Sequence, residues 1–137
     1  MLVVDANVII SALIKNSITR ELINSGFLEL ISVQFVFEEI NKHKEELLKK
    51  SGLSILEYEK TLSLIKSKII IFPNEYFKDY LKLAEQISPD VNDVQYFALA
   101  LKTGTAIWSN DKALKSQRMV AIFSTSEVIK LLENNSL

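Results

Sequence analysis

Short apolar runs rich in β-branched residues alternate along the chain with segments whose apolar residues recur at helical spacing. Such runs are typical of parallel strands that are buried on both faces. The alternation predicts a three-layer α/β/α domain around a mostly parallel sheet of four or five strands. The expected strands are Leu2 to Val4, Phe27 to Val33, Ile69 to Phe72, Thr105 to Ser109 and Val120 to Phe123.

Helices are expected between these strands and after the last one. Gly26 and Gly104 are typical helix-ending residues, and Ser54 fits the N-cap of a helix that follows it. The expected helices run from about Asn7 to Lys15, Thr19 to Ser25, Gln34 to Lys50, Ser54 to Ile65, Tyr76 to Ile87, Asp90 to Lys102 and Thr125 to Leu132, with a short helix after Asn110-Asp111. The aromatic residues expected in the core are Tyr58, Tyr76, Tyr80 and Trp108.

Composition limits the chemistry that the chain can support. With 137 residues and 48% hydrophobic composition, the chain fits one domain over residues 1–137 with a single core. There is no cysteine and only one histidine, which excludes thiolate zinc sites, cysteine nucleophiles and sites built from several imidazoles. Any metal must therefore be bound mainly by oxygen, which suits Mg²⁺ or Mn²⁺.

Charge and hydropathy bear on the partners and the cellular location of the protein. Sixteen basic and seventeen acidic residues give a net charge of −1, which argues against the strongly basic surface of a non-catalytic nucleic-acid binder. The apolar segment from Val8 to Ile14 is too short to span a bilayer, and the N-terminus lacks the pattern of a signal peptide. We therefore expect a cytoplasmic protein with no membrane partner.

Four acidic residues fall where a parallel sheet would bring them together. Asp5 and Asp111 directly follow expected strands, and Glu39 lies near the start of the helix that leaves the second strand. Asp93 lies at the start of the helix that leads into the strand at Thr105. Because ligands bind beyond the carboxyl ends of parallel strands, all four carboxylates are expected at one edge of the sheet.

Such convergence has an electrostatic cost. Two like charges about 4 Å apart repel by about 4 kcal/mol at an effective dielectric of about 20. A divalent cation would offset this repulsion. Without one, some of these carboxyl groups are expected to have raised pKa values.

Simpler structural roles compete with these assignments. Asp90 and Asp111 fit helix caps, and Glu38 stands beside Glu39 as an alternative second acid, although Glu39 precedes the apolar Ile40. His43, one turn beyond Glu39, fits a solvated or half-buried side chain better than a ligand. A basic cluster on the same segment fits a solvated face, with contact to an RNA backbone as the alternative; it consists of Lys42, Lys44, Lys49 and Lys50.

The acidic positions and their surroundings resemble the PIN domain family along nearly the whole chain. Val3 to Leu13 is similar to the family's first strand, its Asp-x-Asn motif and the helix start that follows. Phe37 to Ile40 resembles its second acidic position, Asp93 to Ala100 its third, and Ser109 to Lys112 its fourth. Each motif is short, but four of them occur in the right order and structural context.

The resemblance implies Mg²⁺- or Mn²⁺-dependent cleavage of RNA phosphodiester bonds. It also implies the toxin role of a toxin–antitoxin pair, with an antitoxin protein as partner, and a homodimer. In this picture Asp5, Glu39 and Asp93 hold the metal and Asp111 completes or orients its shell. Asn7 and Ser109 would fix the carboxylates by hydrogen bonds. Basic residues near the expected edge would bind flanking phosphates, namely Lys15, Arg20, Lys112, Lys115 and Arg118.

Three other functions compete with the nuclease. A PIN scaffold without catalysis would serve as an RNA-binding or protein-interaction module, although such a module does not need clustered carboxylates. An aspartyl phosphohydrolase generally has a second aspartate two residues after the first, where this chain has Asn7. A receiver-like signalling domain also has an aspartate at a sheet edge, but no partner surface is marked in the sequence.

Overall fold

The computed structural model describes residues 1–14 and 16–134, and within them a parallel sheet forms the centre of the molecule. Its strands lie in the order β3-β2-β1-β4-β5, and every neighbouring pair is parallel. The predicted α/β/α fold is therefore confirmed. The strands are β1 (Leu2–Val4), β2 (Leu30–Val33), β3 (Ile69–Phe72), β4 (Ala106–Trp108) and β5 (Ile122–Phe123).

The strand order places a crevice at the end of β1. From β1 the chain moves outward through β2 to β3, and later returns to the other side of β1 with β4 and β5. The connections leaving the carboxyl ends of β1 and β4 therefore diverge, and in open parallel sheets ligands bind at this kind of switch point.

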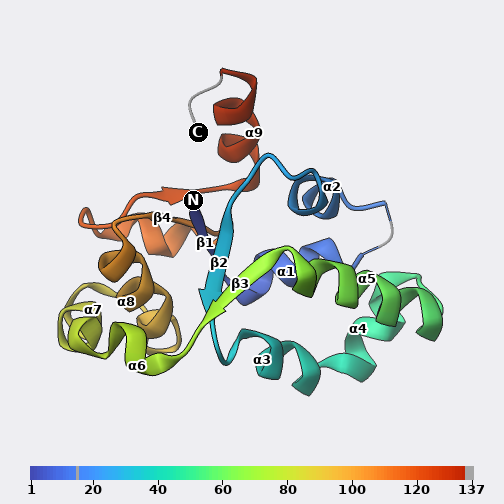
Figure 1. Ribbon diagram of the computed structural model, residues 1–137, viewed down its shortest axis with the longest axis horizontal. Helices are drawn as coiled ribbons and strands as arrows, with labels where there is room; N and C mark the ends of the chain where they lie inside the picture. The colour runs from blue at the N-terminus through green and yellow to red at the C-terminus, as the bar shows by residue number, and fades with distance from the viewer. Residues whose placement is uncertain (15, 135–137) are drawn as a thin grey trace.

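Helices cover both faces of the sheet. Figure 1 shows α6, α7 and α8 on one side of the central strands and α1, α2 and α5 on the other. Helix α8 contacts β1, β2 and β4, while α1 contacts α2 and α3. The bounds are α1 (Ala6–Ala12), α2 (Ile18–Asn24), α3 (Val36–Lys42), α4 (Lys44–Ser51), α5 (Ile55–Ser67), α6 (Asn74–Phe77), α7 (Leu81–Ile87), α8 (Val94–Thr103) and α9 (Thr125–Glu133).

Three short 3₁₀ segments complete the described elements: η1 (Lys78–Tyr80), η2 (Val91–Asp93) and η3 (Lys112–Ser116). The core lies between the sheet and these helical layers and includes Trp108 and Tyr58, both of which are fully buried as predicted. Among the helices of the described residues, none combines the length and apolar character needed to cross a bilayer.

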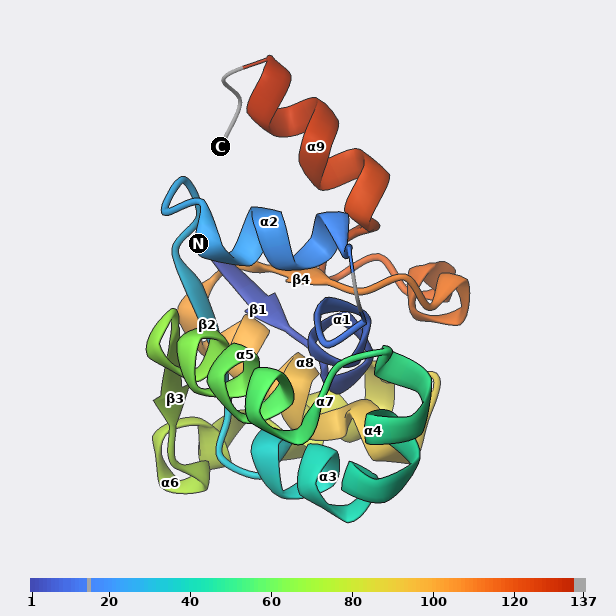
Figure 2. The same cartoon turned by 90° about the vertical axis from the view of Figure 1, so that its right-hand side faces the viewer.

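One predicted helix is two helices in the structure. The segment from Gln34 to Lys50 breaks at His43, whose amide donates to the Ile40 carbonyl in a tighter turn than an α-helix makes. The break changes the direction of the chain and brings α4 into contact with α5 (Figure 2). Apolar residues at helical spacing on both sides of the break had suggested one continuous helix.

Other boundaries also differ from prediction. Strand β2 begins at Leu30 rather than Phe27, which lies after a turn at Gly26 and is 79% exposed. Tyr76 is not in the core: it is 42% exposed and stacks on Phe72 at the surface, with ring centroids 4.6 Å apart. Helix α6, which contains Tyr76, ends at Phe77 and is followed by the 3₁₀ segment η1. The predicted α-helical spacing therefore does not hold from Tyr76 to Tyr80.

Candidate active site

Asp5 stands at the switch point, directly after β1. Its side chain caps α1, because Oδ1 accepts a hydrogen bond of 2.9 Å from the Val8 amide. The side chain is buried, and burial raises the pKa of the carboxyl group. Hydrogen bonds from the Ser109 hydroxyl and the Val8 amide lower this pKa, and the charge of Asp111 raises it further. Asp5 is thus a buried acid whose ionised form is only partly compensated.

Asp93 is the second acid of the site and the most strongly perturbed. It ends η2 and precedes the first residue of α8. Partial burial raises its pKa from 3.8 to about 6, and the charges of Asp5, Asp90 and Asp111 contribute in that order. No basic side chain pairs with it among residues 1–14 and 16–134. Asp93 therefore shares one negative region with the other acids.

Glu39 completes the group that lines one pocket. The pocket has a volume of about 270 Å³, and its walls include Asp5, Glu39 and Asp93. Glu39 lies in α3 and is half-buried, whereas the neighbouring Glu38 is exposed and does not line the pocket. The other lining residues are Ala6, Asn7, Ile10, Phe35, His43, Asn92 and Tyr96.

Asp111 lies at the same edge but outside the pocket wall. Its side chain is exposed, and Oδ1 accepts from the Ala113 amide at 3.0 Å, which caps η3. Its amide donates to Ser109 Oγ at 3.1 Å. Since the buried Ser109 hydroxyl also acts on Asp5, Ser109 connects the end of β4 with the carboxylate after β1. Asp111 therefore influences the pocket in two ways: its charge raises the pKa of Asp5 and Asp93, and its amide donates to Ser109.

Two further predicted residues have simple structural positions. Asn7 lines the pocket, but in the described part of the chain its side chain makes no hydrogen bond to a carboxylate. Asp90 is exposed and caps η2, since its Oδ1 accepts from the Asn92 amide at 2.9 Å. Its charge nevertheless raises the pKa of Asp93.

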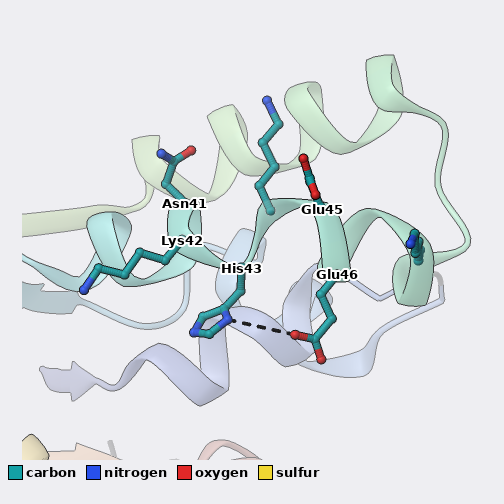
Figure 3. Close-up of a pocket in the computed structure, with 7 residues that line it drawn as sticks. Asn41, Lys42, His43, Glu45 and Glu46 are labelled. Atoms are coloured by element: carbon teal, nitrogen blue, oxygen red, sulfur yellow. Dashed lines mark ion pairs between the residues drawn. The ribbon is translucent and has the colours of Figure 1, made fainter.

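His43 lies between the carboxylate pocket and a second pocket. Its Nε2 is 3.9 Å from Glu39 Oε2, and its Nδ1 is 3.9 Å from Glu46 Oε2. The second pocket, of about 620 Å³, is formed where α3 gives way to α4 (Figure 3). Most lysines of this region pair with acids: Lys44 with Glu59, Lys50 with Glu46 and, at a longer distance, Lys42 with Glu39.

The basic residues predicted to bind phosphates do not line the carboxylate pocket. Lys15 lies outside the described residues. Arg20 donates to the Ala12 carbonyl at 3.3 Å, and Lys115 pairs with Glu127. Lys112 and Arg118 are exposed and make no ion pair within the described part of the chain, so they are the two available for a phosphate.

The pocket fits a hard divalent cation in its donor chemistry. Three carboxylates from different elements line one pocket. The pKa of Asp93 is raised by burial and then by the charges of Asp5, Asp90 and Asp111, and a cation would relieve that repulsion. Within residues 1–14 and 16–134, no three acidic or histidine side chains are already close enough to hold one ion. The residues that would hold an ion here are Asp5, Glu39 and Asp93.

Tyr96 is a pocket residue that the sequence did not mark as functional. It lies on α8 one turn beyond Asp93, is 3% exposed, and packs against Phe35 with ring centroids 5.5 Å apart. Its hydroxyl oxygen is buried, and among the described residues the hydroxyl proton has no acceptor. Burial, followed by the charge of Asp5, raises the pKa of Tyr96. An aromatic residue on a buried helix is typical of core packing, so no sequence signal distinguished it.

Comparison with known proteins identifies the family. A search of curated proteins finds no match. The PIN domain family pattern matches residues 3–130, which include every acid described above. PIN domains are generally nucleases and typically bind divalent metal ions. With a match that covers most of its length and a fold of the corresponding type, the chain belongs to the PIN domain family.

Proposed function

We propose that this protein is a Mg²⁺- or Mn²⁺-dependent endoribonuclease that hydrolyses RNA phosphodiester bonds. The observation that carries the proposal is the shared pocket of Asp5, Glu39 and Asp93, which lie far apart in the sequence. Burial, followed by the charges of Asp5, Asp90 and Asp111, raises the pKa of Asp93 in this pocket to about 6. Carboxylates that only stabilise a fold gain nothing from this arrangement, because each weakens the ionised form of the others.

In the proposed mechanism, Asp5, Glu39 and Asp93 would hold the ion. When bound, Mg²⁺ or Mn²⁺ supplies Lewis acidity toward the scissile phosphate and the attacking water. Asp5 is held by the Val8 amide and by Ser109, so its carboxylate is oriented before substrate arrives. Asp93, whose pKa is raised to about 6 chiefly by burial, would hold the ion in its ionised form. Asp111 acts through Ser109 on the orientation of Asp5.

The proposal extends to two partners beyond RNA: an antitoxin protein, which would make this chain a toxin, and a second copy in a homodimer. What supports them is the resemblance to toxin ribonucleases. Sedimentation of the purified chain tests the dimer, and co-purification with the product of an adjacent reading frame tests the antitoxin.

A non-catalytic PIN scaffold is the second candidate, and one observation favours it: no three ligands are already assembled among the described residues. Incubation of purified protein with single-stranded RNA in Mg²⁺, Mn²⁺ or EDTA separates the two. Cleavage that requires a metal and stops in EDTA supports the nuclease. Binding of intact RNA under all three conditions supports the scaffold.

A further inference from the structure

The hydroxyl of Tyr96 is an unused hydrogen-bond donor in the wall of the carboxylate pocket. The side chain lines this pocket, and less than 1 Å² of its hydroxyl oxygen is exposed. No described residue accepts a hydrogen bond from it. The contact with Phe35 limits movement of the ring, so the side chain stays in the wall of the pocket that the carboxylates also line.

The groups around this hydroxyl are almost all acceptors. The carboxylates of Asp5, Asp93 and Glu39 all raise the pKa of Tyr96, with Asp5 acting most strongly among them. The backbone amide of Ala6 lowers this pKa, because an amide N–H can only donate to the hydroxyl oxygen and cannot accept its proton. Tyr96 therefore keeps its proton, and that proton lacks an acceptor. Because the hydroxyl is sealed from solvent, the acceptor must come from the pocket wall.

Asp5 is the acceptor that the arrangement favours. Its Oδ1 accepts from the Val8 amide, and a carboxylate offers about four lone-pair sites. Sites therefore remain for a second donor and for a metal ion. A small change in the side-chain torsion of Asp5 would be needed when an ion enters the pocket.

We propose that Tyr96 is a positioning residue whose hydroxyl donates a hydrogen bond to the Asp5 carboxylate and holds it in the orientation that binds the ion. This inference rests on the proposed nuclease function. Partners of this kind, which bond to a ligand rather than to the metal, commonly set metal affinity.

Tyr96→Phe tests the inference, with Tyr58→Phe as the matched control. Tyr58 is also fully buried with a hydroxyl that has no partner, but it lies on α5 and does not line the pocket. Titration calorimetry with Mn²⁺ alone should show binding weakened roughly 10- to 100-fold in Tyr96→Phe. Binding by Tyr58→Phe should match the wild type. RNA cleavage at subsaturating Mn²⁺ should follow the same order.

Thermal unfolding without metal supplies the structural control. Each substitution removes a buried hydroxyl whose proton has no acceptor among the described residues, so neither variant should have a lower Tm than the wild type. Wild-type Mn²⁺ affinity in Tyr96→Phe would overturn the inference and leave the nuclease proposal standing. Loss of affinity accompanied by a lower Tm would also overturn it, because damaged packing would explain the loss. A wild type that binds no Mn²⁺ would overturn the nuclease proposal itself, and the inference with it.

Discussion

Asp93 connects stability to the proposed chemistry. Its carboxyl group is half-buried beside Asp5 and within the influence of Asp90 and Asp111, and no cation in the described part of the chain balances it. A site that must attract a divalent ion requires such uncompensated negative charge. The folded protein without metal therefore has a lower free energy of unfolding because of this residue, and the proposed divalent ion would remove that cost.

Asp93→Asn is expected to stabilise the metal-free protein at neutral pH. The folded-state pKa of Asp93 is raised from 3.8 to about 6, so between these values the folded state retains a proton that the unfolded state has released. The free energy of unfolding therefore falls as the pH rises through this window. At pH values above this window, the ionised Asp93 lowers the free energy of unfolding by roughly 1–2 kcal/mol, after allowance for solvent screening of a half-buried group.

Urea unfolding in EDTA, at about pH 4 and about pH 7.5, measures this effect. The variant should lose less stability than the wild type between the two pH values. Equal losses would show that Asp93 does not titrate in this window.

Glu39 and Glu38 form a natural pair for testing which second acid matters. Glu39 lines the pocket and Glu38 does not, although they are adjacent. Glu39→Gln should reduce cleavage by at least the roughly 10- to 100-fold that removal of an outer-shell partner costs at metal sites. Glu38→Gln, assayed at the same Mn²⁺ concentration, should cleave like the wild type. The reverse order would move the second acid to Glu38.

At the scale of elements, the approximate positions of the strands could be predicted, because buried strands have continuous apolar runs. The placement of three acids at one edge could also be predicted, because parallel topology determines which loops share an edge. The break at His43 could not be predicted, since apolar residues keep helical spacing on both sides of it. The buried hydroxyl of Tyr96 was also missed. Whether a hydroxyl has a partner depends on neighbours far away in the sequence.

Helix α5 provides a prediction about stability alone. Ser54 and Glu57 form a capping box: Ser54 Oγ accepts from the Glu57 amide at 3.1 Å, and Glu57 accepts from the Ser54 amide at 3.0 Å. Ser54→Ala should lower the free energy of unfolding by about 1 kcal/mol. Cleavage by the folded protein should not change, because α5 does not line the pocket.

Ser63→Ala, an exposed substitution within α5, is the control and should leave stability nearly unchanged. Chemical denaturation compares all three proteins. Equal stability of Ser54→Ala and wild type would mean that the cap contributes nothing.

At the scale of the whole molecule, charge must serve two opposing needs. The pocket is acidic and RNA is an anion, while the chain has a net charge of −1. Most lysines near His43 are paired with glutamates, so they offer little free positive charge. A metal ion would neutralise the pocket, and exposed basic residues elsewhere would have to hold the flanking phosphates.

We expect weaker RNA binding, whatever the RNA sequence, from Lys112→Ala and from Arg118→Ala. In each variant the slope of log K against log salt concentration should become shallower by about 1. Both side chains are exposed and free of ion pairs within the described residues. Lys60→Ala, on α5, removes an exposed charge from an element outside the pocket and serves as the control. Unchanged slopes in both test variants would exclude these residues from the RNA contact.

Cleavage of a mixed single-stranded RNA by wild type, Asp5→Asn and Asp93→Asn tests the central claim most directly. Each substitution keeps the shape of the side chain and removes its charge, and folding is checked by circular dichroism. The account predicts cleavage by the wild type in Mg²⁺ or Mn²⁺, none in EDTA, and loss of activity in both folded variants. Metal-dependent cleavage that persists in both variants would contradict it.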